Sequence, residues 1–485
     1  MKKETLEQQI KRSGEDYFGT KTSHLTFNLP LKKSTFPWIR YLTWGTPTLA
    51  FGLTFTVMVS ILIGATRPNG SLPQDFTGLQ ALNEVSFPSF QQREQAEDFE
   101  FGRPDYNNYR IALEDYFQLT APHLFTTNDN IVYSPLSAYV ALSLLLEAAS
   151  GETEIALTNV LGVEDRLSFR QESNQVFIDT YFKDEITISG NTFTRAQSQL
   201  GNGVFVREDI TVNEDYLLTL AGDYFAEVFH TAFDDAGKEA IAGWLNQRTN
   251  RFLSMQPSDL TMNQDTVLSL FNTLYLKANW LHAFTPVSQT GAFTNTSDDS
   301  VISEVTYMQK ETQETLYLDQ PNFTLGVDEA YGDYRVVYVL PKGNLKPVDL
   351  LDDPYFDLIR SALTQTNQNE RIRLTIPKST TKMKLDLKEN LLAVAPQIAS
   401  LFSPEEADLS NALPGAYVQN LVQHVRMDFL EAGMEAAAIT EADVGVTSMP
   451  TPAKVSLTLD RSYLYFVVNS QGLILFSGVM NQPSF

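Results

Sequence analysis

Cysteine is absent from the 485-residue chain. Its absence excludes disulfide bonds, thiol catalysis and zinc sites built from cysteine. The folded part must therefore depend on its apolar core. Apolar residues make up 43% of the sequence and include 31 Phe and 20 Tyr, which is the composition of a globular protein rather than of a disordered chain.

Basic residues are scarce relative to acidic ones. Lys and Arg number 35 against 59 Asp and Glu, which gives a formal net charge of −24. A surface of this sign repels phosphate backbones, so we expect no nucleic-acid partner. The sequence also has no basic stripe of the kind that binds polyanions, and we expect no polyanion cofactor.

The common catalytic motifs are missing as well. The five histidines include no HExxH pair, and the chain has neither a GxSxG segment nor a glycine-rich phosphate loop. Acidic pairs such as Asp234-Asp235 lack the partner series of a calcium loop. We therefore predict that the protein is not an enzyme and that it uses no cofactor and no metal.

One long stretch, residues 46–65, carries no charge and is long enough to cross ~30 Å of hydrocarbon as a helix. The 45 residues before it hold eight Lys or Arg against four acids, which by the positive-inside rule places the N-terminus in the cytoplasm. A buried core helix and a signal peptide cleaved after Ile63-Gly64-Ala65 are the alternatives. The long polar segment that precedes the stretch favours a membrane anchor.

These features predict four parts. They are a cytoplasmic segment (1–45), a transmembrane helix (46–65), a flexible stalk (66–104) rich in Pro, Gly, Ser, Gln and Glu, and a globular domain (105–485). We expect a single-pass protein of the cell membrane whose globular domain lies outside the cell.

The globular domain begins with helical patterns and continues mainly with strands. Apolar stripes at helical spacing cover residues 109–119 and 136–149, and Ser134 followed by Pro135 is typical of a helix start. The β-rich runs that follow are 267–276, 335–340, 371–376, 454–459, 463–468 and 473–476. Helices and strands mixed in one block predict an α+β fold.

Residues 431–449 combine small side chains with an alternating pattern. One face of a strand built from them is small and apolar and holds Met434, Ala436, Ala438, Thr440, Ala442, Val444 and Val446. A helix over 431–440 is an alternative, because alanine favours helices. Gly433 and Gly445 favour instead an exposed loop that can also become a strand.

Residues 431–440 read EAGMEAAAIT and resemble the hinge of the serpin family. Further segments resemble the same family in order and spacing. They are NIVYSPLS at 130–137, NGVFV at 202–206, IAGWL at 241–245, NTLYLKANW at 272–280 and LFSGVMNQP at 475–483. The resemblance covers the whole globular domain.

The resemblance implies a serpin fold with three β-sheets, eight or nine helices and an exposed reactive-centre loop. It also implies a monomeric inhibitor that acts on serine proteases as a suicide substrate, because the cleaved loop inserts into the large sheet. Counting from the hinge glycine places the reactive bond between Thr447 and Ser448. With Val446 and Thr447 before the bond, an elastase-like or subtilisin-like protease fits best.

The resemblance also assigns roles to individual residues. The hinge comprises Gly433, Met434, Glu435, Ala436, Ala437, Ala438, Ile439 and Thr440, and the sheet-opening region comprises Ser134, Ser137, Asn272 and Trp280. Simpler roles remain open for three of them. Ser134 is also explained as a helix cap, Asn272 as a satisfied buried amide and Trp280 by apolar burial alone.

Two residues depart from the family pattern. Met434 stands where inhibitory members carry Thr or Ser, and a longer side chain there would slow insertion. His424 lies one residue nearer the hinge than the family's sheet-core histidine, so either a bulge corrects the register or Gln423 occupies that site. The alternative function is a non-inhibitory serpin-fold module for binding or adhesion at the cell surface.

Overall fold

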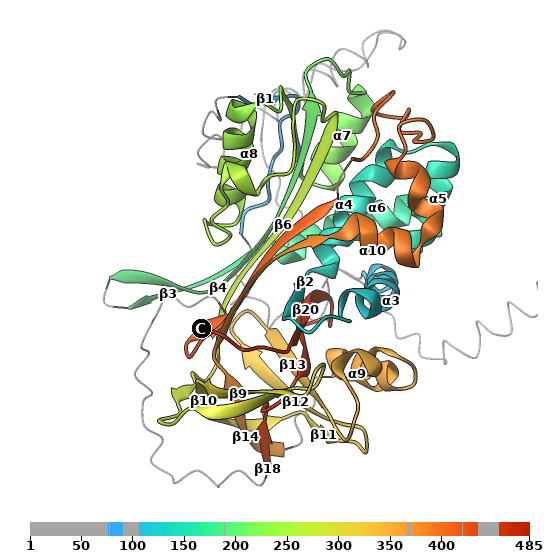
Figure 1. The fold of residues 1–485 in the computed structure, drawn as a ribbon. Helices are drawn as coiled ribbons and strands as arrows, with labels where there is room; N and C mark the ends of the chain where they lie inside the picture. The colour runs from blue at the N-terminus through green and yellow to red at the C-terminus, as the bar shows by residue number, and fades with distance from the viewer. Residues whose placement is uncertain are drawn as a thin grey trace, which may run out of the picture. The chain divides into compact units, whose positions relative to one another are not determined.

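The longest strands form an eight-stranded sheet, here called sheet A (Figure 1). The computed structural model describes residues 76, 78–90, 106–188, 190–365, 370–419, 421–434 and 455–485. Sheet A has the order β1-β5-β4-β6-β17-β16-β15, with β3 paired to the first part of β4. Its strands are β1 (Gln80–Ala81), β3 (Phe182–Ile188), β4 (Asn191–Arg207), β5 (Ala226–Thr231), β6 (Leu268–Asn279), β15 (Ser379–Asp386), β16 (Val422–Phe429) and β17 (Gly433–Met434).

Two further sheets pack in the same domain. Sheet B has six strands in the order β11-β12-β13-β19-β20-β2, and sheet C has four in the order β18-β14-β10-β7; β8 and β9 form a separate ladder. The bounds are β2 (Ile131–Tyr133), β7 (Thr285–Pro286), β8 (Gly291–Asn295), β9 (Ser300–Val305), β10 (Tyr307–Thr315), β11 (Tyr317–Asp319), β12 (Phe323–Ala330), β13 (Tyr334–Pro341), β14 (Glu370–Pro377), β18 (Val455–Thr458), β19 (Tyr463–Val468) and β20 (Ile474–Met480). Every β-rich run predicted from the sequence forms one of these strands.

Eight α-helices and three short 3-10 helices lie within the described residues. They are α3 (Asn107–Leu124), α4 (Pro135–Ala148), α5 (Gly151–Leu161), α6 (Arg166–Thr180), α7 (Glu214–Asp223), α8 (Asp235–Arg248), α9 (Tyr355–Thr364), α10 (Leu387–Val394), η3 (Pro257–Asp259), η4 (Pro347–Leu351) and η5 (Pro396–Phe402). The predicted helices at 109–119 and 136–149 correspond to α3 and α4. The α+β fold is confirmed.

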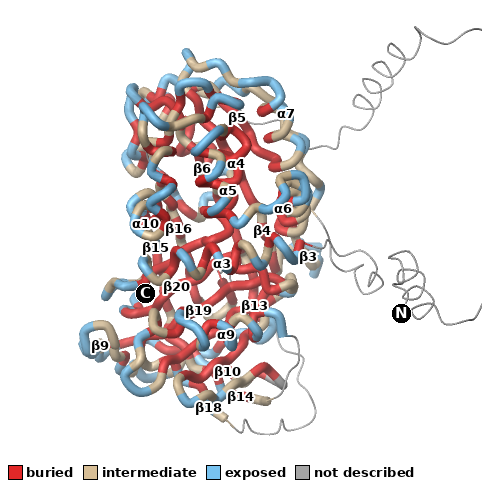
Figure 2. Tube along the Cα trace, turned by 90° about the vertical axis from the view of Figure 1, so that its right-hand side faces the viewer, coloured by how far each residue is buried: buried red, intermediate tan, exposed pale blue. Residues whose placement is uncertain are grey.

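Helix α4 lies at the centre of the core. Ser134 caps its first turn by accepting a hydrogen bond from the Ser137 amide (3.2 Å), and Pro135 takes the first helical position, where no backbone donor is needed. All fourteen residues of α4 are buried, including the polar Ser137, Ser143 and Glu147, so the helix runs through the interior (Figure 2).

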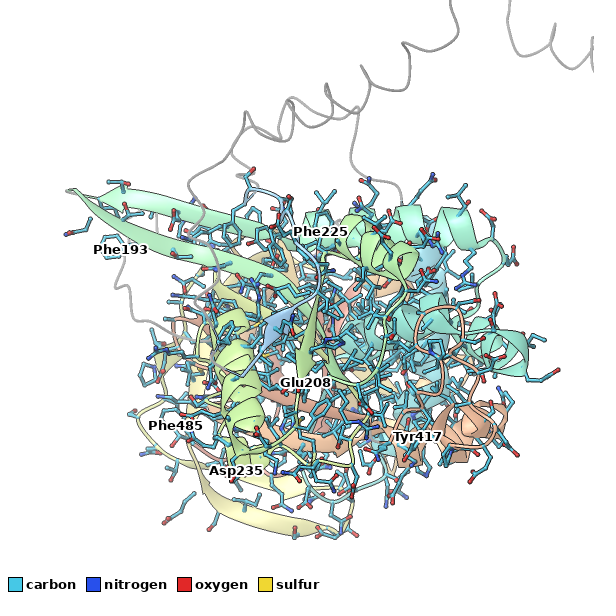
Figure 3. The ribbon with its side chains drawn as sticks, turned by 90° about the horizontal axis from the view of Figure 1, so that it is seen from above. Phe193, Glu208, Phe225, Asp235, Tyr417 and Phe485 are labelled. Carbon is cyan, nitrogen blue, oxygen red and sulfur yellow. The ribbon has the colours of Figure 1, made fainter. Side chains whose placement is uncertain are left out.

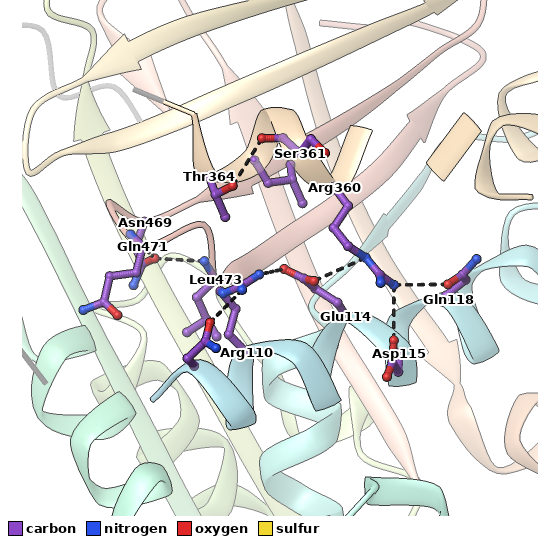
Figure 4. A network of polar contacts seen from close by, with 12 residues as sticks. Arg110, Glu114, Asp115, Gln118, Arg360, Ser361, Thr364, Asn469, Gln471 and Leu473 are labelled. Atoms are coloured by element: carbon purple, nitrogen blue, oxygen red, sulfur yellow. Dashed lines mark hydrogen bonds and ion pairs between the residues drawn. The ribbon is translucent and has the colours of Figure 1, made fainter. Parts of the chain in front are cut away.

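A buried carboxylate joins α3 to α9. Glu114 of α3 is 1% exposed and forms ion pairs with Arg110, one helical turn earlier, and with Arg360 of α9 at 3.3 Å (Figure 4). Arg360 also reaches Asp115 at 3.2 Å. Burial raises the pKa of Glu114, while the two guanidinium groups oppose that rise.

Part of the segment expected to be a stalk packs against the domain. β1 pairs antiparallel with β5 at the edge of sheet A. The Asn83 side chain receives a hydrogen bond from the Val228 amide (2.9 Å) and donates one to the Ala226 carbonyl (3.0 Å). Residues 78–90 therefore behave as part of the globular domain, because apolar and hydrogen-bonding side chains fix them to the sheet edge. The rest of the expected stalk lies outside the described residues.

The predicted cytoplasmic segment and transmembrane helix, residues 1–65, also lie outside the described residues. Among the helices of the described part, none is both long and apolar enough to cross a membrane.

Candidate functional site

A tight turn connects β16 to β17 at the end of sheet A. The Leu430 amide donates to the Gly433 carbonyl (3.1 Å), and the Gly433 amide donates to the Leu430 carbonyl (3.2 Å). The outer side of the turn is fixed by the segment after β6, where the Trp280 amide donates to the Ala432 carbonyl (3.0 Å). The turn sends the chain back into sheet A.

Strand β17 lies between β6 and β16. Met434 pairs with Ala278 on one side and with Phe429 on the other, and Gly433 pairs with Asn279. Both ladders are antiparallel, so β17 runs from the end of the sheet toward its centre. The first two residues of the predicted hinge, Gly433 and Met434, therefore form a strand of sheet A in the uncleaved protein.

The two residues of β17 are suited to this position in different ways. A Cβ on Gly433 would overlap the Ala278 carbonyl and lie 2.7 Å from the Asn279 Cα, so only glycine fits. Met434 is 1% exposed and belongs to the main core cluster. The methionine that departs from the family pattern thus contributes apolar burial in the uncleaved protein.

Beyond Met434 the strands on either side of β17 separate. Among the described residues, β6 and β16 share no ladder and are connected only through β17. Two adjoining cavities follow the gap. The residues of β6 and β16 that line them include Leu268, Leu270, Asn272, Leu274, Val422, His424 and Arg426. Sheet A is open along the line that one further strand would occupy.

Gln423 lies on the side of the gap that faces the start of α4, where it hydrogen-bonds to the backbone of Ser134. Its side-chain oxygen accepts from the Ser134 amide (3.0 Å), and its side-chain nitrogen donates to the Ser134 carbonyl (2.8 Å). The register between β15 and β16 is continuous from Ser379–Phe429 to Asp386–Val422. No bulge shifts β16 to bring His424 to the sheet-core position, so Gln423 occupies that position instead.

A sequence signal for this assignment exists. Val425, Met427 and Phe429 alternate as apolar residues, and Gln423 continues their parity, so it points to the same buried side. His424 has the opposite parity and faces the segment after α8. Burial, and then the charge of Lys384 beside it, lower the pKa of His424 to about 4, while Asp259 opposes this shift.

Three of the four predicted sheet-opening residues come together beneath the gap. Ser134, Ser137 and Asn272 line one cavity with Gln423. The Ser134 hydroxyl both caps α4 and donates to the Leu475 carbonyl of β20 (2.8 Å), so its capping role is confirmed and it also joins the helix to sheet B. Asn272 donates to the Asn202 side chain, and its own side-chain oxygen is buried without a hydrogen-bond partner in the described structure.

Trp280 lies apart from these three, at the end of the sheet where β17 enters. Its indole nitrogen donates to the Leu430 carbonyl (2.9 Å), and its ring lies against Phe429 and Phe284. The Lys310 ammonium lies 4.9 Å from the ring centroid. Trp280 thus does more than fill space, because it hydrogen-bonds the turn that directs the hinge.

A charge pair that the sequence did not point to supports Trp280. Lys310 of β10 and Asp328 of β12 are buried and form an ion pair at 2.5 Å. Burial lowers the pKa of Lys310 and raises that of Asp328, and each charge opposes the shift of the other. The two residues lie on different sheets and in no shared motif, so nothing in their spacing marks them.

The remaining hinge residues, from Glu435 to Thr440, and the reactive bond between Thr447 and Ser448 lie outside the described residues. By chain order, residues 435–454 connect Met434 in sheet A to β18 in sheet C. The described part of the site therefore comprises the hinge turn, the opened sheet and the side chains that line the gap.

Comparison with known proteins agrees with this architecture. Neuroserpin of Mus musculus is 26% identical over 374 residues, which cover 73% of this chain and 87% of the relative. The crystal structure of tengpin, a thermophilic serpin in its native state, has a TM-score of 0.67 at 20% identity and covers 83% of this chain and all of that one. Human thyroxine-binding globulin in complex with thyroxine has a TM-score of 0.66 at 20% identity, with 78% of this chain and all of that one covered.

A family model provides the assignment. The model described as "Serpin (serine protease inhibitor)" matches residues 107–483, which is most of the chain and nearly all of the predicted globular domain. The chain belongs to the serpin family of serine protease inhibitors.

Proposed function

We propose that the protein inhibits serine endopeptidases as a suicide substrate whose loop is cleaved between Thr447 and Ser448. Serpins are protease inhibitors and not enzymes, so the chain itself performs no catalytic step. The observation that carries the proposal is the position of β17. Gly433 and Met434 occupy the first positions of a strand between β6 and β16, and the gap continues beyond them.

The proposed reaction uses the serine of the target protease. Its oxygen attacks the carbonyl carbon of Thr447, the bond to the Ser448 nitrogen breaks, and that nitrogen leaves as a new amine. The protease then remains attached to Thr447 through an ester. Insertion of the cleaved loop gives partners to the backbone groups of β6 and β16 that face the gap, which stabilises the inserted form.

The composition of the loop supports insertion. Residues of one parity from Met434 to Val446 are small or apolar, so they suit the buried side of a new strand. The residues before the bond, Val446 and Thr447, are β-branched and modest in size. We therefore propose elastase-like or subtilisin-like targets.

The membrane location is a separate part of the proposal. The uncharged residues 46–65, preceded by a basic excess, support a single-pass anchor with a cytoplasmic N-terminus and an extracellular serpin domain. We propose that the protein acts there as a monomer on proteases that reach the cell surface. Protease treatment of intact cells, with tags at both termini, tests the orientation; loss of the N-terminal tag would contradict it.

The decisive experiment incubates the purified chain with elastase-like, subtilisin-like and trypsin-like proteases. We expect a covalent complex that survives denaturing electrophoresis, a released fragment that begins at Ser448, and a rise in thermal stability after cleavage. The variant Thr447→Arg is the matched control, and it should transfer complex formation to the trypsin-like enzyme.

Cleavage without a covalent complex and without a gain in stability, across the panel, would contradict inhibition. It would leave the alternative, a serpin-fold binding module. Thyroxine-binding globulin, crystallised with thyroxine, is an example of a serpin-fold protein with a small-molecule ligand.

A further inference from the structure

A two-stranded hairpin projects from sheet A. It consists of β3 and the first part of β4, and the chain reverses between Ile188 and Asn191. The hairpin extends away from the helices and the other sheets, and Phe193 lies near its outer end (Figures 1 and 3). Neither the fold nor the hinge accounts for this projection.

The two faces of the hairpin differ. Ile186 pairs directly with Phe193, and Ile188 has the same parity, so these three side chains share one face. Ile188 is 41% exposed, and the other two are partly exposed. The opposite face is polar, with the hydroxyls of Thr187 and Thr192 hydrogen-bonded to each other at 3.2 Å.

The base of the hairpin is firmly held. Asp184 and Arg195 form a cross-strand ion pair at 2.8 Å, and the Arg195 guanidinium lies 4.6 Å from the Tyr331 ring centroid. Phe182 at the start of β3 is 1% exposed, and the Ser198 hydroxyl bonds to the Thr180 carbonyl (2.5 Å). The apolar face is therefore presented on a positioned element.

The hairpin extends past the end of the sheet where the loop begins. Ala278 of β6 pairs with Ala196 of β4 on one side and with Met434 of β17 on the other, so all three lie on one rung of sheet A. Residues 191–195 of β4 continue outward from that rung for about 15 Å at the usual rise of a strand.

The distances fit a single bound partner. β4 and β17 are separated by one intervening strand, which corresponds to about 10 Å. A protease domain of ~200 residues is about 40 Å across, which is wide enough to meet the hairpin while it is engaged on the loop. The loop ends at β18 in sheet C. The same sheet contains β7, which begins only a few residues after Asn279, the last residue of β6.

We infer that the apolar face formed by Ile186, Ile188 and Phe193 is a docking surface for the target protease, and that it speeds the encounter before the loop is cleaved. This inference rests on the proposed inhibitory function. The four charged residues of the hairpin, Lys183, Asp184, Glu185 and Arg195, cancel one another, so the contact on the protease is apolar rather than charged.

The test compares two double variants of the full chain. Ile188→Thr with Phe193→Thr removes apolar surface but keeps residues that favour strands. Thr187→Ser with Thr192→Ser changes the polar face and is the matched control. For each, the second-order rate constant of inhibition and the stoichiometry are measured with the protease that gives the best complex.

We expect the first variant to slow inhibition about tenfold, equivalent to ~1.4 kcal/mol, because aromatic contacts dominate protein interfaces. Its stoichiometry and melting temperature should match those of the wild type, and the control should behave as the wild type. An unchanged second-order rate constant of inhibition would overturn the inference, whether or not the stoichiometry changes.

The same comparison separates this inference from the proposed function. If no protease forms a covalent complex, inhibition fails, but the rate of loop cleavage still gives the ratio between wild type and variant. A tenfold ratio in cleavage would support the docking surface alone. A wild-type dimer in sedimentation, or binding to neutral lipid vesicles, that the first variant abolishes would assign the face to another occupant and overturn the inference.

Discussion

The Lys378 ammonium lies 3.1 Å from the Glu431 carboxylate and joins the residue before β15 to the turn that leads into β17. Both side chains are partly buried, at 17% and 31% exposure. Lys378 also lies over the Phe485 ring, 3.7 Å from its centroid. The pair thus ties the hinge turn to the start of β15, the edge strand of sheet A nearer to β17.

A double-mutant cycle with Lys378→Met and Glu431→Gln isolates this pair from the ring contact. We expect a coupling free energy of about 0.5–1 kcal/mol, because partly exposed ion pairs gain little beyond their desolvation. The coupling should weaken in high salt. Denaturant unfolding of the four proteins measures it, and strictly additive effects would show that the ion pair does not stabilise the turn.

Met434→Thr tests whether methionine hinders the hinge. Because Met434 is already buried in the uncleaved protein, truncation should lower the free energy of unfolding by about 2 kcal/mol. The stoichiometry of inhibition should remain unchanged, since the first rung of insertion exists before cleavage. Met308→Thr, at a buried position in sheet C, is the control for lost stability alone. A threonine variant that inhibits more efficiently would contradict this view.

Gln423→Leu should be the most damaging change within the opened sheet. It leaves the Ser134 amide without its partner, while the Ser134 carbonyl keeps the hydrogen bond from the Ala138 amide (3.2 Å); an unsatisfied buried group costs about 1–3 kcal/mol. We expect the free energy of unfolding to fall by about 2 kcal/mol. Gln309→Leu, at an exposed position on β10, should change it by less than ~0.5 kcal/mol. Equal effects of the two variants would refute the role assigned to Gln423.

His424 predicts a pH dependence of stability. Its pKa is lowered to about 4 by burial and by Lys384, with Lys382 adding to the shift and Asp259 opposing it. Between the usual pKa of about 6.5 and this value, the unfolded chain binds a proton that the folded protein does not. The histidine therefore makes the protein less stable as the pH falls through this range.

Replacing His424 with Gln should remove this effect. Between pH 7 and pH 5 the wild type should lose about 1 kcal/mol more than the variant, once the partial exposure of the ring is allowed for. The difference between the two unfolding curves is the relevant quantity, because carboxylates titrate equally in both. Parallel curves would show that the ring is not protected from protonation.

The pattern of the chain predicts much of the scaffold but only part of the site. The strands of sheets B and C are apolar or alternating runs, and Ser134-Pro135 marks the start of α4. Family resemblance located Gly433 and Trp280, and the steric contacts of the glycine now give the physical reason. Whether His424 or Gln423 occupies the sheet-core position could not be decided from the sequence, because that depends on the register of β16 against β15.

The features that we could not predict from the sequence depend mostly on contacts between residues far apart in the chain. Lys310 and Asp328 meet only because sheets B and C pack together, and local spacing carries no trace of this. The β3–β4 hairpin had a readable signal, since apolar residues alternate with Thr on both sides of Ser189-Gly190, as Ile-Thr-Ile at 186–188 and Thr-Phe-Thr at 192–194. The two residues of β1 are too few to show a period.

Strand β1 also has a consequence for how the domain can be handled. It covers β5, whose backbone would otherwise form one open border of sheet A, and the Leu82 amide adds a hydrogen bond to the Val228 carbonyl (2.8 Å). Unpaired strand borders recruit strands from other molecules. A domain trimmed to begin after residue 90 would expose this border and should self-associate. A shortened form of the serpin domain should therefore retain residues 78–90, which composition alone would assign to a dispensable tether.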